Sequence, residues 1–118
     1  MRRSTLVGIV PLLSLLATGQ AAAHAFLERA EPRVGNRVAT PPQQVTLWFS
    51  EKLEAAFSRM TVTNAAGQRV DTGKARVSGN QMSISVRPGG AGAYRVNWHV
   101  LSADTHTTDG DFTFQVGQ

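Results

Sequence analysis

Residues 94–101, Tyr-Arg-Val-Asn-Trp-His-Val-Leu, alternate apolar and polar side chains over the longest such run in the chain. Successive side chains on a β-strand point to opposite faces, so every second residue from Tyr94 to Val100 would lie on one apolar face. His99 falls on the other face, where we expect an exposed strand residue rather than a metal ligand. The stretch therefore predicts a β-strand with one side packed against a core.

Shorter runs of the same kind occur along the rest of the chain, separated by turn residues such as Pro, Gly and Asn. They cover residues 25–30, 45–49, 60–63, a short piece around Val70, 75–78, 82–86 and 112–116. Residues 50–57 could hold one helical turn or be a loop, and residues 107–110 have the composition of a turn. Seven or eight short strands with little helical periodicity predict an all-β domain, a small antiparallel sandwich or barrel.

The parts of a secretion signal stand in order at the start of the chain: a charged pair at 2–3, an apolar core at 6–17 and small residues at 21–23. We therefore expect residues 1–23 to be a signal peptide cleaved between Ala23 and His24, which leaves one exported domain, 24–118. An uncleaved membrane anchor is the alternative, but the apolar core is too short to span a bilayer. The arginine pair leaves the general and the twin-arginine export routes both open.

The composition limits the classes of ligand. The chain has 118 residues, which suits one domain, and no cysteine. An exported domain without cysteine has no disulfide, and it must hold any metal through nitrogen, carboxylate oxygen or thioether sulfur. Cleavage would lower Lys and Arg from 12 to 10 against 8 Asp and Glu, so the net charge would fall from +4 to +2. No basic run is interleaved with aromatic residues, so we do not expect nucleic acid as a partner.

Two potential metal ligands, Asp104 and His106, stand two residues apart in the segment after the long strand. On an extended segment they would point to the same side and could bind one ion. Loops at the end of a rigid scaffold commonly carry binding groups. The motif alone equally fits a solvated loop in which Asp104 caps a turn.

His24 becomes the first residue of the mature chain if the signal is cleaved as predicted. Its α-amine and imidazole can then form a chelate ring on one metal ion; alternatively, His24 is an arbitrary terminal residue that frays in solvent. Combined with Asp104 and His106, it would supply an amine, two imidazoles and a carboxylate. Three nitrogens and one oxygen in a roughly square arrangement favour Cu(II), whereas Zn(II) prefers a tetrahedral site.

These features resemble the CopC family of small periplasmic copper-binding proteins. The resemblance covers nearly the whole predicted mature chain and rests on four stretches: His24 directly after the signal, residues 41–51 with Trp-Phe-Ser-Glu, residues 94–106 with Ser-Ala-Asp-Thr-His, and residues 110–114. It implies a Greek-key β-barrel of cupredoxin or immunoglobulin type. It also implies one Cu(II) per chain, bound by His24, Asp104 and His106.

Glu51 corresponds by position to an acidic residue that the family places close to the copper site. We expect Glu51 to have an outer role, in which it accepts a hydrogen bond or balances charge. A plain surface carboxylate is the alternative.

The chain departs from the family in its methionines. Several family members carry a methionine-rich site for Cu(I). The predicted mature chain has only Met60 and Met82, both on apolar faces of expected strands. We therefore expect the two methionines to fill the core, and we expect no Cu(I) site.

The residues and the resemblance together predict a monomeric periplasmic copper carrier that is not an enzyme. It would capture Cu(II) at His24 and either sequester it or pass it to an inner-membrane copper transporter of the CopD type. Copper resistance and copper import both stay open as its role.

Two other functions are alternatives. A terminal histidine with a second histidine is also the copper site of lytic polysaccharide monooxygenases, although those enzymes are usually much larger. The other alternative is a β-sandwich interaction module that binds no metal.

Overall fold

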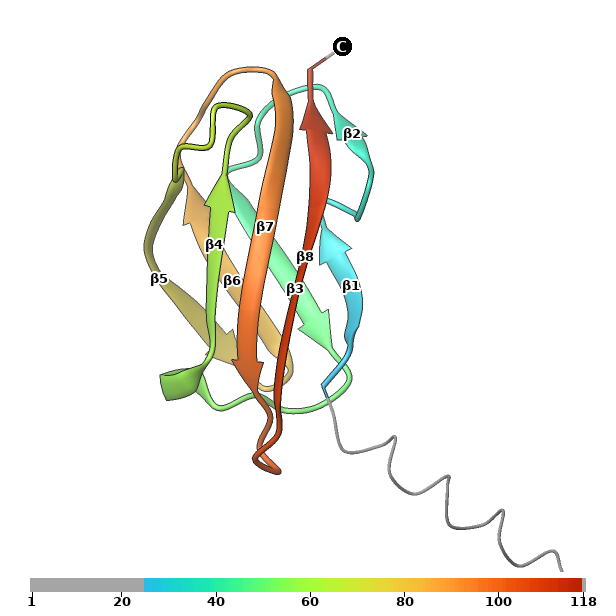
Figure 1. The fold of residues 1–118 in the computed structure, drawn as a ribbon, viewed down its shortest axis with the longest axis vertical. Coiled ribbons are helices and arrows are strands. Elements are labelled where there is room, and N and C mark those ends of the chain that lie inside the picture. The colour runs from blue at the N-terminus through green and yellow to red at the C-terminus, as the bar shows by residue number, and fades with distance from the viewer. Residues whose placement is uncertain (1–24, 118) are drawn as a thin grey trace, which may run out of the picture.

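The computed structural model describes residues 25–117, which form β-strands, turns and one short 3-10 helix (Figure 1). The strands in chain order are β1 (Leu27–Glu31), β2 (Arg37–Val38), β3 (Gln44–Phe49), β4 (Arg59–Thr63), β5 (Asp71–Ser78), β6 (Gln81–Val86), β7 (Gly92–Leu101) and β8 (Thr107–Val116). The 3-10 helix, η3 (Ala55–Phe57), lies between β3 and β4. The predicted all-β class is therefore confirmed. Within residues 25–117, no helix has the length and apolar character needed to cross a membrane.

The strands form two four-stranded sheets that pack face to face as a sandwich (Figure 1). One sheet has the order β1-β3-β6-β5 and the other the order β2-β8-β7-β4. Neighbouring strands are antiparallel except β2, which runs parallel to β8. The chain crosses from one sheet to the other after β1, β2, β3, β4 and β6, so the predicted sandwich is correct.

Alternation along β7 places its apolar side chains in the core, as predicted. Tyr94, Val96 and Val100 are fully buried, and Trp98 is half-buried. Tyr94 stacks on Phe114 of β8, with the ring centroids 5.4 Å apart. The opposite sheet contributes three fully buried side chains from β3: Val45, Leu47 and Phe49. Alternate residues of both sheets thus form one core.

Both methionines of the described chain are core residues. Met60 of β4 is 3% exposed, and Met82 of β6 is fully buried. Their thioethers therefore fill space inside the sandwich, which confirms the prediction of core packing.

The strand β2 and the continuity of β5 differ from the sequence-based expectation. Arg37–Val38 is too short to show alternation and pairs with β8 only in the folded chain. The two short strands expected around Val70 and at 75–78 are replaced by the single strand β5, which begins after Val70. Its register shifts between Thr72 and Arg76, around Gly73, whose φ is 73°. This irregularity interrupts the alternation that a sequence pattern would reveal.

Residues 107–110, expected as a turn, instead begin β8. Their Thr-Thr-Asp-Gly composition is typical of turns, yet each residue pairs with β7 between Trp98 and Leu101. Ten consecutive pairs join β7 and β8, so the long hairpin overrides the local preference. The connecting turn is therefore shorter and comprises residues 102–106.

One end of the sandwich collects the segments next to the predicted ligands (Figure 1). The loop between β7 and β8, the start of β1 and η3 all lie at this end, and the C-terminus lies at the opposite end. The predicted ligand loop and the entry of the chain into the domain therefore share one end of the fold.

Candidate metal centre

The loop between β7 and β8 is a tight turn closed by backbone hydrogen bonds. Ser102 N donates to His106 O at 2.9 Å, and Thr105 N donates to Ser102 O at 2.9 Å. Thr105 has a φ of 73°, a left-handed conformation that is uncommon for a residue other than glycine. The segment is not extended, so the argument from the spacing of Asp104 and His106 along a strand is wrong.

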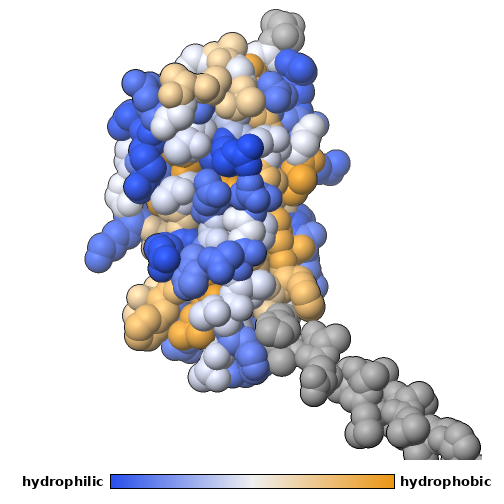
Figure 2. All heavy atoms as spheres, in the orientation of Figure 1, coloured by the Kyte–Doolittle hydropathy of each residue, from blue (hydrophilic) through white to orange (hydrophobic). Residues whose placement is uncertain are grey.

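The turn nevertheless brings these two predicted ligands together. Asp104 Oδ1 lies 3.5 Å from His106 Nδ1, and both side chains are 46% exposed. A carboxylate and an imidazole this close together, at an accessible loop tip, are suitable donors for a divalent metal ion. Figure 2 shows polar side chains at this tip and apolar surface beside it at η3, where Phe57 is 63% exposed.

Hydrogen bonding favours the ionised form of Asp104. Ser102 Oγ donates to Asp104 Oδ1, and this bond is the main reason why the pKa of Asp104 lies below its ordinary value. Desolvation acts in the opposite direction, and His106 lowers the pKa of Asp104 further through a hydrogen bond and through its charge. Asp104 therefore stays a carboxylate, the form that binds metal, to a lower pH than an ordinary aspartate.

The start of β1 is tied to the segment that follows β3. Phe26 N donates to Ser50 Oγ, and Ser50 N donates to Phe26 O, each at 2.8 Å. Two residues further on, Lys52 O accepts a hydrogen bond from Ala103 N at 2.9 Å. Residues 50–52 thus connect the entry of the chain to the loop between β7 and β8.

His24 and Glu51 keep the status of predictions. His24 lies outside the described residues, of which Ala25 is the first. Glu51 is half-buried and lies within the connecting segment 50–52. Within residues 25–117, no three His, Asp or Glu side chains cluster as a metal site. Asp104 and His106 would therefore need further donors from elsewhere in the chain.

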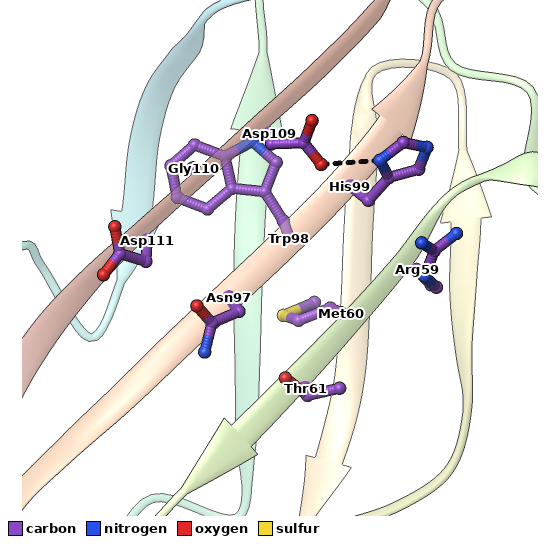
Figure 3. A pocket seen from close by; sticks show the side chains of 9 residues that line it. All are labelled: Arg59, Met60, Thr61, Asn97, Trp98, His99, Asp109, Gly110 and Asp111. Carbon is purple, nitrogen blue, oxygen red and sulfur yellow. Dashed lines mark hydrogen bonds and ion pairs between the residues drawn. The ribbon is translucent and has the colours of Figure 1, made fainter.

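A second histidine–aspartate pair lies on the outer face of the sheet that contains β4, β7 and β8 (Figure 3). His99 Nδ1 is 2.6 Å from Asp109 Oδ1 on the neighbouring strand. The pair lines a shallow hollow of about 410 Å³, together with Arg59 and Asp111 among others, and none of the predicted ligands lines it. His99 is a strand residue, as predicted, but its side chain is only 30% exposed because it packs beside Asp109.

The hydroxyls of Ser50 and Ser102 support this end of the fold, and neither is among the predicted site residues. For Ser102 the sequence holds a signal, because Ser and Asp side chains in turns commonly form local hydrogen bonds. For Ser50 it holds none, because the partner of its hydroxyl, Phe26 N, is 24 residues away.

Residues 27–117 match the family model of the CopC domain. The protein YobA of Escherichia coli K12 is 33% identical over 121 residues, which cover 97% of this chain and 95% of YobA. The copper transport protein CutJ of Bacillus subtilis is 30% identical over 100 residues. These make up 81% of this chain and 18% of CutJ, so the matching region is a small part of CutJ.

Two solved structures share the fold. CopC from Methylosinus trichosporium OB3b superposes with a TM-score of 0.74 at 29% identity, covering 80% of this chain and 94% of that one. PcoC, described as a methionine rich copper resistance protein from Escherichia coli, superposes with a TM-score of 0.70 at 33% identity. That superposition covers 79% of this chain and 98% of PcoC.

Proposed function

This chain belongs to the CopC family, and on that premise we propose that it is a periplasmic protein that binds one Cu(II) ion per chain. The family consists of copper-binding proteins of copper resistance and transport rather than enzymes. Membership of the CopC family identifies copper as the ligand. The oxidation state, the stoichiometry and the residues that bind the ion belong to our proposal.

Four donors would bind the ion: the amine and imidazole of His24, the carboxylate of Asp104 and the imidazole of His106. The main support is the 3.5 Å approach of Asp104 Oδ1 to His106 Nδ1 at an accessible loop tip. Nitrogen and carboxylate donors suit Cu(II), which divalent sites generally bind more tightly than other first-row metal ions. The hydrogen bonds between Phe26 and Ser50 hold the chain at the same end of the sandwich, two residues after His24.

Glu51 would act outside the copper coordination sphere. It lies in the segment that connects the entry of the chain to the ligand loop, and its side chain is half-buried. From there its carboxylate would balance the positive charge of the ion or accept a hydrogen bond from a copper ligand.

Export would complete the site. A signal peptidase that cuts between Ala23 and His24 during passage to the periplasm would create the α-amine that chelates the ion. Metal binding would then be confined to the mature protein, because in the precursor the nitrogen of His24 is part of a peptide bond.

Copper would stay in one oxidation state on this protein. PcoC is described as methionine rich, whereas both methionines of the described chain here are buried in the core. Thioethers are the soft ligands that Cu(I) prefers, and a buried thioether is out of reach of an incoming ion. We therefore propose a single Cu(II) site and no Cu(I) site.

The bound ion would be sequestered or passed to a membrane copper transporter of the CopD type. Delivery is supported by the match to CutJ, a copper transport protein in which the matching region is a minor part of a longer chain. In CutJ the matching region is part of the transport protein itself. A chain that consists mainly of this region is therefore suited to pass copper to a separate transporter. The protein would do so as a monomer.

Neither alternative from the sequence gains support. The monooxygenase alternative is an enzyme, and family membership opposes it. The metal-free module is opposed by membership of a family of copper-binding proteins.

The decisive experiment compares Cu(II) binding by the chain that begins at His24 with binding by a chain carrying one extra residue before it. The extra residue converts the amine into a peptide nitrogen and leaves every side chain in place. Because donors linked in one chelate ordinarily gain about 10²-fold or more in affinity, we expect a loss of at least that size. Competition with a chromophoric chelator measures the affinity. Equal affinity of the two forms would refute the proposed terminal chelate.

A further inference from the structure

Ser102 is a fully buried serine at the point where β7 ends. Its exposed fraction is 0%, and its backbone forms an isolated antiparallel β-bridge with Leu53, in the segment after β3. A hydroxyl removed from water is costly unless it makes hydrogen bonds, so its partners reveal what it is used for.

The Ser102 hydroxyl contacts the side chain of Asp104 and the backbone of His106 at once. Its Oγ donates to Asp104 Oδ1 and accepts a hydrogen bond from His106 N at 3.2 Å. A hydroxyl has one proton and two lone pairs, so it can make both bonds together. His106 O also lies 3.1 Å from the Oγ, but the hydroxyl has a single proton, and the charged Asp104 carboxylate, which lies closer, is the stronger acceptor.

The hydroxyl is not needed to close the turn. The backbone of Ser102 alone makes the two closing hydrogen bonds, to His106 O and from Thr105 N. These bonds would persist if the side chain were removed. What the hydroxyl adds is the orientation of the Asp104 carboxylate relative to the backbone of His106.

We propose that Ser102 is a positioning residue of the copper site, which fixes the Asp104 carboxylate before the ion arrives. This inference rests on the proposed function. By holding Oδ1, Ser102 restricts the rotation of the side chain, and the second carboxylate oxygen can bind a metal ion. The Asp104 side chain then loses less conformational entropy when the ion binds, and the affinity is higher for that reason.

The test replaces Ser102 by alanine and uses Ser58→Ala as a matched control. Ser58 is also buried, at 9% exposure, and its Oγ accepts a hydrogen bond from Leu101 N at 3.1 Å, next to Ser102 in the chain. Ser58 contacts neither Asp104 nor His106 in any hydrogen bond of the described chain. Both variants therefore lose a buried hydroxyl at the same strand end, but only one loses a contact with a predicted ligand.

Copper affinity, the Cu(II) EPR spectrum and the melting temperature of the copper-free protein are measured for chains that begin at His24. We expect Ser102→Ala to lower the affinity about 10- to 100-fold, as is usual when a group behind a metal ligand is lost, and to change the copper hyperfine splitting. Ser58→Ala should lower the melting temperature to a similar degree but leave affinity and spectrum unchanged. An unchanged affinity and spectrum in Ser102→Ala would overturn the inference, and so would an equal loss in Ser58→Ala.

A double-mutant cycle separates positioning from general damage. If Ser102 acts through Asp104, Ser102→Ala should have little further effect on affinity in an Asp104→Ala background. Additive losses would contradict action through that carboxylate.

A measurement on the unmodified chain covers the case in which Ser102→Ala does not fold. NMR couplings should show a single χ1 rotamer for Asp104 in the copper-free protein, and averaging over several rotamers would overturn the inference. If the unmodified chain bound no Cu(II), the proposed function itself would fail. If the unmodified chain bound Cu(II) but Asp104 occupied several χ1 rotamers in the copper-free protein, only the positioning role of Ser102 would fail.

Discussion

Gly110 of β8 lies directly against the indole of Trp98 on the neighbouring strand β7 (Figure 3). A Cβ at position 110 would be 2.2 Å from Cζ2 of the indole, far inside the contact distance. The same indole packs on Phe49 and Phe112, with ring centroids 6.0 and 6.2 Å away, so it cannot move freely toward the core. Position 110 is thus limited to glycine by space rather than by backbone conformation.

We predict that Gly110→Ala destabilises the copper-free protein by about 1–3 kcal/mol, because the methyl group must displace a packed aromatic ring. Urea unfolding measures the change. Gly90→Ala is the control, since no atom lies within 4 Å of a Cβ there and its φ is ordinary. That variant should stay within about 0.5 kcal/mol of the parent. Equal stability of the two variants would contradict the packing argument.

The strands that could be predicted are those in which each second residue is buried. Along β7, the pattern that identifies Tyr94, Val96 and Val100 as core residues is present in the sequence itself. By contrast, β2 pairs with β8 at Arg37 and Val38 only, and two residues cannot display a period. The start of β8 reads as a turn because its pairing partners are on β7, so its composition alone is misleading.

The candidate site was predictable in its residue types but not in its geometry. Asp104 and His106 are recognisable as donors, yet they meet because a turn with Thr105 in a left-handed conformation folds them together. The role of Ser50 could not be derived from local sequence, because the partner of its hydroxyl, Phe26 N, is 24 residues away. The partners of Ser102 lie within its own turn, so there the sequence holds a signal.

His106 and His99 offer a direct test of which histidine binds copper. We predict that His106→Gln lowers Cu(II) affinity by about 10²-fold, because one donor of a linked set is lost. His99→Gln should leave the affinity unchanged, because His99 pairs with Asp109 and lines a hollow on the outer sheet face that none of the predicted ligands lines. Chelator competition on both variants provides the comparison. If His99→Gln lost as much Cu(II) affinity as His106→Gln, His99 on the outer face of the sheet would have to be a copper ligand, which would contradict the proposed site.

Ser50 is predicted to hold the chain entry in place for the terminal chelate. Ser50→Ala removes the acceptor of the hydrogen bond from Phe26 N. We expect Cu(II) affinity to fall about 3- to 10-fold, the size of one ordinary hydrogen bond. Ser50→Thr keeps a hydroxyl and should restore most of the affinity. Full affinity in the alanine variant would show that the position of His24 does not depend on this contact.

Asp71 is predicted to stabilise the fold in a pH-dependent manner. Burial, the largest single effect, raises the pKa of Asp71. Hydrogen bonds from Arg69 and Val62 N and the charge of Arg69 together outweigh burial, so the pKa is lowered. A lowered folded-state pKa contributes stability above the ordinary value of about 3.9, and this stability is lost as the pH falls through the folded-state pKa.

We therefore expect Asp71→Asn to cost about 1–3 kcal/mol at pH 7 and less at a pH low enough to protonate Asp71 in the folded protein. Denaturant unfolding at both pH values tests this expectation. Asp111→Asn is the control, because the ion pair of Asp111 with Arg95 is half-exposed and should contribute about 0–1 kcal/mol. A cost for Asp71→Asn that is the same at both pH values would contradict the electrostatic explanation.

Copper binding itself should weaken as the medium becomes more acidic, and Asp104 should not be the cause. Its pKa lies below the ordinary value, chiefly because of the hydrogen bond from Ser102, so Asp104 is ionised throughout pH 5–8. An α-amine and an imidazole ordinarily titrate at about 7.7–8.0 and about 6.5, and both must lose a proton to bind metal.

We predict that the affinity for Cu(II) falls steeply from pH 8 to pH 5, by about one log unit per pH unit for each proton that competes. Chelator competition at a series of pH values gives this slope. In Asp104→Asn the affinity should be lower at every pH, but the slope should be the same, because Asp104 takes up no proton in this range. A chain with one residue before His24 should show a shallower slope, since its chelating amine is gone. A slope that decreases in Asp104→Asn instead would make the carboxylate the proton-sensitive ligand and contradict its lowered pKa.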